Sequence, residues 1–132
     1  MKIYYVVILS TQATIRPITF DLLTSKEIKC EKDFLPYYRD ICSRFKIDPN
    51  QVDNLALHKV QKFDLNQNNY VVVFPLNDSM EFKTFEITCD EELTAEGTID
   101  KYGDAMEFYG FDVNKAAGIL LQPLNRELLE KI

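Results

Sequence analysis

The sequence predicts an α+β domain, and three features of the chain support this. Residues 3–9 and 70–76 are apolar almost throughout and rich in β-branched and aromatic side chains, a pattern typical of strands covered on both faces. Between residues 34 and 46 the apolar positions recur with helical spacing. A chain of 132 residues, 46% of them hydrophobic, matches the size and composition of one folded unit. We therefore expect a single globular domain over residues 1–132.

The two apolar runs are expected to form the middle of the sheet, because only central strands are covered on both sides. The full sheet should be antiparallel or mixed, with about five to six strands, and with helices packed on it. Residues 18–28 predict a further strand followed by a loop, since Ile18, Phe20 and Leu22 alternate with polar residues ahead of Thr24 and Ser25.

An amphipathic helix is expected over residues 34–46. Asp33 is the expected N-cap, and Pro36 is tolerated close to the helix start, where N–H groups have no helical acceptor. A second, short helix should begin at Asp48 and Pro49 and end near Leu55. The apolar side chains that share one face of the first helix are Phe34, Tyr37, Tyr38, Ile41, Cys42 and Phe45.

The middle of the chain predicts two hairpins. Residues 56–64 and 70–76 are interpreted as strands joined by the amide-rich turn at 66–69. A turn at 77–79 then leads to strands at 82–89 and 93–100, in which apolar and polar residues alternate. A three-residue loop at 90–92 would set Glu86 directly opposite Glu96, with Cβ atoms about 5 Å apart.

The C-terminal part predicts an aromatic loop and then helices. The loop contains Tyr102, Phe108, Tyr109 and Phe111. Asp112 is the expected cap of a helix that Pro123 kinks or ends. The apolar stripe expected to pack this C-terminal region on the sheet comprises Val113, Ala116, Ala117, Leu120, Leu121, Leu124, Leu128 and Ile132.

The charges of the chain are unevenly distributed. Eleven of its 21 acids lie in residues 78–112 against two lysines, a net charge of −9, while the flanking parts are mildly basic. A field of one sign attracts a partner of opposite charge and repels polyanions. We therefore expect a basic protein surface as the partner and no nucleic acid, and we leave a homo-oligomer open.

Several function classes are disfavoured by what the sequence lacks. No apolar stretch approaches the roughly 20 residues of a membrane span, and residues 3–9 are short for a secretory signal. The three cysteines have no CxxC spacing, which favours reduced thiols and a cytoplasmic location. His58, the only histidine, has no metal-ligating companion at a diagnostic spacing. Phosphate-binding glycine loops and nucleophile elbows are also missing, so we expect no cofactor and recognise no family.

Two hypotheses about function follow. The favoured one is a small non-enzymatic binding or inhibitory protein, such as an immunity protein, antagonist or regulatory subunit, that presents an acidic strand face and an aromatic loop to a basic partner. The alternative is a metal- or small-ligand-binding enzyme, since opposed carboxylates attract a cation or share a proton. The same glutamates also fit a merely solvated strand face. The residues expected to bind the partner are Glu86, Glu96, Glu91, Glu92, Tyr102 and Tyr109.

Overall fold

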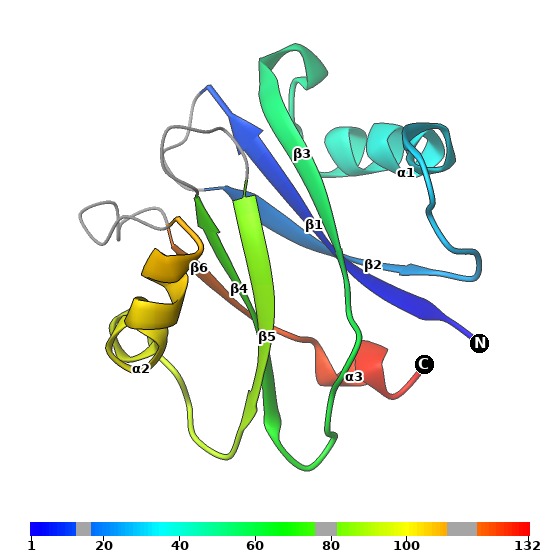
Figure 1. Cartoon of the computed structure of the whole chain (residues 1–132). Helices are drawn as coiled ribbons and strands as arrows, with labels where there is room; N and C mark the ends of the chain where they lie inside the picture. Colours follow the sequence, from blue (N-terminus) through cyan, green and yellow to red (C-terminus); the bar gives the residue numbers. More distant parts are fainter. Residues whose placement is uncertain (13–16, 76–81, 111–118) are drawn as a thin grey trace.

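A computed structural model describes residues 1–12, 17–75, 82–110 and 119–132 of the chain. These residues form two three-stranded antiparallel sheets and their helices (Figure 1). The first sheet has the order β2-β1-β3, from β1 (Ile3–Thr11), β2 (Ile18–Thr24) and β3 (Val52–Lys59). The second has the order β5-β4-β6, from β4 (Asn68–Pro75), β5 (Phe82–Cys89) and β6 (Leu120–Pro123). The α+β class is confirmed, whereas the expected single sheet of five to six strands is wrong.

The two apolar runs do occupy central positions, one in each sheet. β1 lies between β2 and β3, and β4 lies between β5 and β6. Val6 and Val7 are both fully buried although they point to opposite faces of β1, and the same holds for Val71 and Val72 of β4. Each of these strands is covered by the other sheet on one side and by a helix on the other, which is why neither carries a polar face.

The core therefore lies in three layers. Between the sheets pack side chains of β1 and β4, namely Tyr4, Val6, Ile8, Val71 and Val73, together with Leu129. The outer face of the first sheet is covered by α1 (Glu31–Arg44), and that of the second by α2 (Ala95–Phe108). Figure 1 shows these two helices on opposite sides of the molecule.

The helix predicted at residues 34–46 is confirmed as α1, with shifted ends. It begins three residues earlier, because Cys30 is the N-cap residue, and the Asp33 carboxylate instead accepts a hydrogen bond from the Lys29 N–H at 3.1 Å. The predicted cap at Asp48 is present, since its carboxylate accepts from the Asn50 N–H at 3.0 Å. The helix that it caps is only a 3-10 turn (Pro49–Gln51), because β3 starts at Val52.

The hairpin predicted for residues 56–64 and 70–76 is wrong. β3 pairs with β1 in the first sheet, and β4 pairs with β5 and β6 in the second, so the chain between β3 and β4 crosses from one sheet to the other. Asn69 holds the end of this crossing: its amide accepts from the Asp64 N–H at 2.9 Å and donates to the Asp64 carbonyl at 2.8 Å. The turn lies at residues 64–67, slightly before the predicted 66–69, because β4 starts at Asn68, and it connects different sheets.

The strand predicted at residues 93–100 is a second correction. Thr94 caps α2 by accepting from the Gly97 N–H at 3.0 Å, and the helix continues to Phe108. β5 consequently pairs with β4, not with the chain after it. The alternation of apolar and polar residues misled here, because Ile99, Tyr102 and Met106 also follow the helical spacing that packs α2 on the second sheet.

The predicted helix after Asp112 lies mostly outside the described residues, with Val113, Ala116 and Ala117, and its described end is a strand instead. The turn at 77–79, Phe111 and the helix cap at Asp112 lie outside the described residues. Leu120 and Leu121 belong to β6, which pairs with β4, and α3 (Arg126–Leu129) follows. Within the described ranges, no helix is long and apolar enough to cross a membrane.

Polar contacts connect the two sheets at both of their edges. On one side Thr19 of β2 donates to the amide oxygen of Gln122 of β6 at 2.6 Å. On the other side His58 of β3 contacts Thr84 and Glu86 of β5. The sheets are therefore stacked with β2 near β6 and β3 near β5.

Candidate functional site

The acidic residues gather on α2 and the loop that precedes it. Residues 90–110 contain seven carboxylates and one lysine, a net charge of −6, which equals the net charge of the whole chain. All seven of these acidic residues are exposed. The remaining residues are together neutral, so this segment alone gives the protein its negative charge.

On α2 the carboxylates form a single stripe. Glu96, Asp100, Asp104 and Glu107 are separated by four, four and three residues, which puts them on one face of a helix. We call these four residues the acidic stripe. The opposite face carries Met106, which is buried against the second sheet, so the stripe points to solvent. Within the described residues, the ion pair of this segment joins Lys101 to Glu91 at 3.6 Å. It does not involve the four carboxylates of the stripe.

The stripe should lower the stability of α2. Glu96, Asp100 and Asp104 form two successive like-charge pairs at i,i+4 spacing, and each pair costs a helix about 0.2–0.5 kcal/mol. Asp100→Lys removes both repulsions and replaces them with attractive pairs of similar size, so we expect it to raise the free energy of unfolding by about 1–2 kcal/mol. Urea denaturation at low salt checks this. The gain should fade at high salt, and a loss of stability would contradict the stripe geometry.

The aromatic loop predicted around Tyr102, Phe108 and Tyr109 is wrong, because α2 continues to Phe108, and exposed aromatic side chains lie at the end of this helix. Phe108 is 85% exposed and Tyr109 is 56% exposed, and their rings contact edge to face at a centroid distance of 5.4 Å. With a rise of about 1.5 Å per residue, Tyr109 lies about 20 Å along the helix from Glu96. Glu91, Glu92 and Glu96 therefore lie at one end of α2, while Phe108 and Tyr109 lie at the other. Tyr102 is half-buried and faces the sheet.

Glu86 does not join this surface. It lies on β5 opposite Val71 of β4, and its side chain is 14% exposed. Its carboxylate accepts hydrogen bonds from His58 Nε2 at 2.9 Å and from the N–H groups of Gln61 at 2.9 Å and Lys62 at 3.0 Å. The predicted cross-strand pair of Glu86 and Glu96 is thus absent, because Glu96 lies in the first turn of α2.

These contacts keep Glu86 ionised. Burial by itself would raise the pKa of the carboxyl, but the hydrogen bonds from His58 and from two main-chain N–H groups outweigh it and lower the pKa below its ordinary value. The other ring nitrogen of His58, Nδ1, lies 2.7 Å from the Thr84 hydroxyl. Thr84, His58 and Glu86 therefore form one hydrogen-bonded connection between β5 and β3.

This connection is the feature that sequence reasoning missed. A hydroxyl, an imidazole and a carboxylate in a row resemble the order of groups in a nucleophilic triad. His58 and Glu86 are only 13% and 14% exposed, and the Glu86 carboxylate also accepts from two main-chain N–H groups, so these contacts connect β5 to the first sheet. In the sequence, His58 and Glu86 are single polar residues of two strands and are 28 positions apart. Only the sheet topology brings them into contact.

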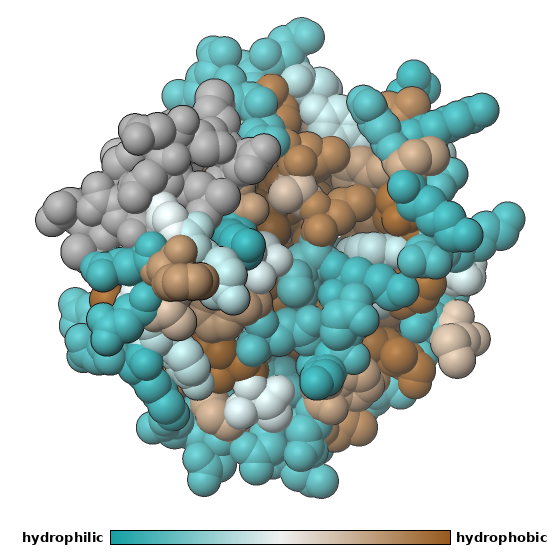
Figure 2. All heavy atoms as spheres, in the orientation of Figure 1, coloured by the Kyte–Doolittle hydropathy of each residue, from teal (hydrophilic) through white to brown (hydrophobic). Residues whose placement is uncertain are grey.

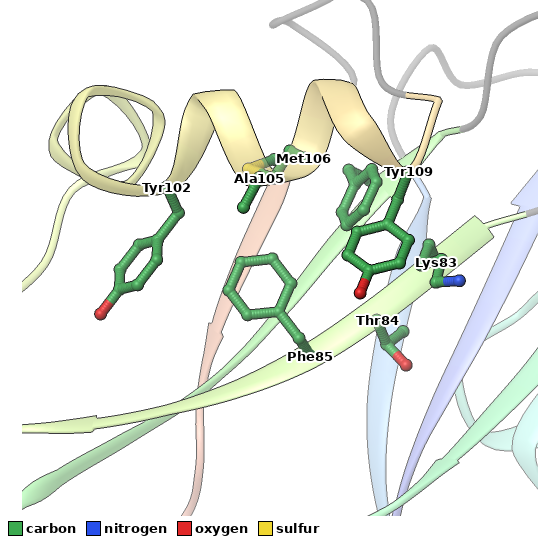
Figure 3. A pocket seen from close by; sticks show the side chains of 8 residues that line it. Lys83, Thr84, Phe85, Tyr102, Ala105, Met106 and Tyr109 are labelled. Atoms are coloured by element: carbon green, nitrogen blue, oxygen red, sulfur yellow. The ribbon is translucent and has the colours of Figure 1, made fainter.

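An apolar cavity of about 400 Å³ lies between α2 and β5. Figure 3 shows Tyr102 and Tyr109 projecting from the helix on either side of Phe85, which rises from the strand. The Lys83 ammonium lies 4.6 Å from the centroid of the Tyr109 ring. The lining includes Phe74, Lys83, Phe85, Tyr102, Met106 and Tyr109.

A second hydrophobic hollow lies on the other side of the molecule, between α1 and β3. Figure 2 shows it as a hydrophobic area in the region of these two elements. Phe34 and Leu55 line it, and Leu35, which is 45% exposed, lies beside them. Neighbouring charges of both signs on α1, such as Arg39 and Asp40, distinguish it from the acidic side of α2.

The described residues contain no group of three or more His, Cys, Asp or Glu side chains arranged to hold a metal ion. Comparison with protein families, curated proteins and solved structures found no match for this chain. The exposed carboxylates of residues 90–110 and the cavity beside α2 are therefore the features of the molecule that indicate a function.

Proposed function

We propose that this protein is a small acidic protein-binding module, of the immunity-protein, antagonist or regulatory-subunit kind, that binds a basic surface on a partner protein. The observation that carries the proposal is the concentration of the entire net charge in residues 90–110, all of whose carboxylates are exposed. Glu91, Glu92 and Glu96 would pair with basic side chains of the partner. Phe108 would provide apolar contact at the end of α2, whereas Tyr102 and Tyr109 line the cavity on the face of the helix opposite the stripe and are left out of this surface.

Electrostatic attraction by these carboxylates is expected to speed the association with a basic partner. Charges of one sign over a patch raise the association rate of an oppositely charged partner by about 10- to 1,000-fold at low salt. Screening acts over about 8 Å at physiological ionic strength, so the effect depends on carboxylates that lie close together, as on successive turns of α2. Exposed aromatic residues beside such charges are frequent energetic centres of interfaces. Glu86 is left out of the binding surface because it is engaged inside the molecule.

The alternative function, an enzyme that uses Glu86 and Glu96 together, loses its geometric basis. Glu86 belongs to β5, an edge strand of the second sheet, and its side chain contacts the first sheet. Glu96 lies on the solvent side of α2. No cation can be assigned to them as a pair. Small-molecule binding is considered separately below, at a different place in the fold.

The test is to isolate the partner with the native protein as bait and to measure the association rate. The triple variant Glu96→Lys, Asp100→Lys, Asp104→Lys should lower the rate at least about tenfold at low salt, with a smaller effect at high salt. The control variant Asp40→Lys, Asp53→Lys, Glu130→Lys changes the net charge equally at exposed positions outside the segment. It should slow association much less. Equal effects of the two variants would mean that net charge, and not this surface, matters.

A further inference from the structure

We propose that the cavity between α2 and β5 binds a small planar apolar molecule that carries one anionic group, and that Lys83 binds this anion. The inference is independent of the proposed partner protein. It rests on the shape and lining of the cavity and on the position of one lysine.

The size and lining of the cavity suit such a ligand. Its volume of about 400 Å³ lies within the range of about 300–1,000 Å³ that is usual for ligand sites. Its walls are largely aromatic: the Phe85 ring lies 5.8 Å from the Tyr102 ring and 6.0 Å from the Phe74 ring. Met106, which is buried, adds a thioether that adapts to an aromatic face. A flat ring system inserted between the helix and the strand would stack on these side chains.

The positive charge of a lysine at the cavity indicates that the ligand carries an anionic group. Lys83 is exposed, lines the cavity and stands over the Tyr109 ring at 4.6 Å. Lys101 is not part of the lining; it stands over the Tyr102 ring at 5.8 Å, and its ammonium also lies 3.6 Å from Glu91. Lys83 and Lys101 are the two lysines of the acidic residues 78–112. Because Lys101 already has a carboxylate partner, Lys83 is assigned to the ligand.

The acidic stripe does not prevent an anion from binding in the cavity. It lies on the face of α2 opposite the side chains that line the cavity, which are spaced i, i+3, i+4 and i+7 from Tyr102 to Tyr109. An α-helix with its side chains is about 10 Å across, close to one Debye length at physiological salt. The repulsion of the anion by the stripe is therefore largely screened, whereas the contact with Lys83 is direct.

Two fluorescent probes test the proposal, because they share a ring system and differ in charge. Anilinonaphthalene sulfonate is anionic, and phenylnaphthylamine is neutral. We expect both to bind the native protein, the sulfonate more tightly. Lys83→Gln should weaken sulfonate binding about tenfold and leave the neutral probe unchanged, since a charge-assisted contact is lost. Lys101→Gln is the matched control and should change sulfonate binding less than about twofold.

A second pair of variants locates the site. Ala105 is an exposed residue of α2 that lines the cavity, so Ala105→Trp should fill the space and abolish binding of both probes. If this variant proves misfolded by circular dichroism, Ala105→Leu replaces it. Leu35→Ser, in the hollow beside α1, should leave binding unchanged.

Two outcomes would overturn the inference. Probe binding that survives a folded Ala105 variant, or that is lost in Leu35→Ser, would place the probes elsewhere on the surface. Equal weakening of the sulfonate by Lys83→Gln and Lys101→Gln would remove the assignment of the anion to Lys83. Neither result bears on the charge-reversal test of partner binding, so the two proposals fail separately.

Discussion

Replacing Glu86 with alanine is expected to lower the free energy of unfolding by about 3 kcal/mol. The substitution removes the common acceptor of three hydrogen bonds, from His58 and from the main-chain N–H groups of Gln61 and Lys62. Hydrogen bonds to a charged group contribute about 1.5–3 kcal/mol each, and partly buried donors left without an acceptor add a penalty. Some of this loss is offset, because water reaches the exposed N–H groups in the variant.

Chemical denaturation of the variant measures this change. Asp104→Ala is the matched control, since it also removes one carboxylate but from an exposed position on α2. It should alter the free energy of unfolding by less than about 0.5 kcal/mol. If the two variants were equally stable, the carboxylate of Glu86 would not connect the sheets.

Glu86 also makes a defined contribution to the pH dependence of stability. Its pKa in the folded protein lies below the ordinary value of 4.5. A carboxylate with a lowered pKa contributes stability that is fully present above the unfolded pKa and is lost as the pH falls through the folded pKa. The contribution of Glu86 to the difference in stability between the native protein and Glu86→Gln should therefore shrink as the pH falls below about 4.5. A difference that persisted unchanged at pH 2 would contradict this assignment.

Leu129→Ala is expected to have an effect of similar size, about 3 kcal/mol. Leu129 is only 2% exposed and packs between the two sheets with residues of β1 and β4. Truncating a buried leucine costs about 2–5 kcal/mol, because transfer free energy is lost and a cavity remains. Ile132→Ala removes a similar side chain from a position that is 42% exposed, so it should cost less than about 1 kcal/mol.

Thermal and urea denaturation of the two variants compare these expectations directly. The apolar spacing of the sequence placed Leu124, Leu128 and Ile132 on the packed side of the C-terminal region and did not include Leu129. Leu124 and Leu128 do pack against the core, so the comparison tests Ile132, the described member of the stripe that is 42% exposed. A larger loss in Ile132→Ala than in Leu129→Ala would favour the stripe.

The predictions that succeeded depended on local patterns with one physical interpretation. The helix at α1 was found because Phe34, Ile41 and Cys42 recur at a spacing that only a helix turns to one face, and all three are buried. The position of β1 and β4 at the centre of their sheets followed from runs in which neither face is polar. The role of Asp48 as a cap followed from its own side chain and the proline that comes next.

The predictions that failed depended on which distant segment a strand would meet. Residues 93–100 fit both a strand and the first turns of a helix, and the choice was decided by Thr94, whose hydroxyl caps α2. The preceding strand, β5, then found its partner in β4. Because register and pairing depend on the whole sheet, the position opposite Glu86 could not be obtained from the alternation alone.

The sequence by itself determined the α+β class, the central strands, the first helix and the acidity of one segment, because each of these follows from composition or from the periodicity of neighbouring residues. Only the tertiary structure decided that the strands form two sheets, that Glu86 is enclosed with His58, and that the four acidic residues of α2 lie on one side of it. Contacts between residues far apart in the chain are selected by the packing of all layers together, so no local pattern specifies them.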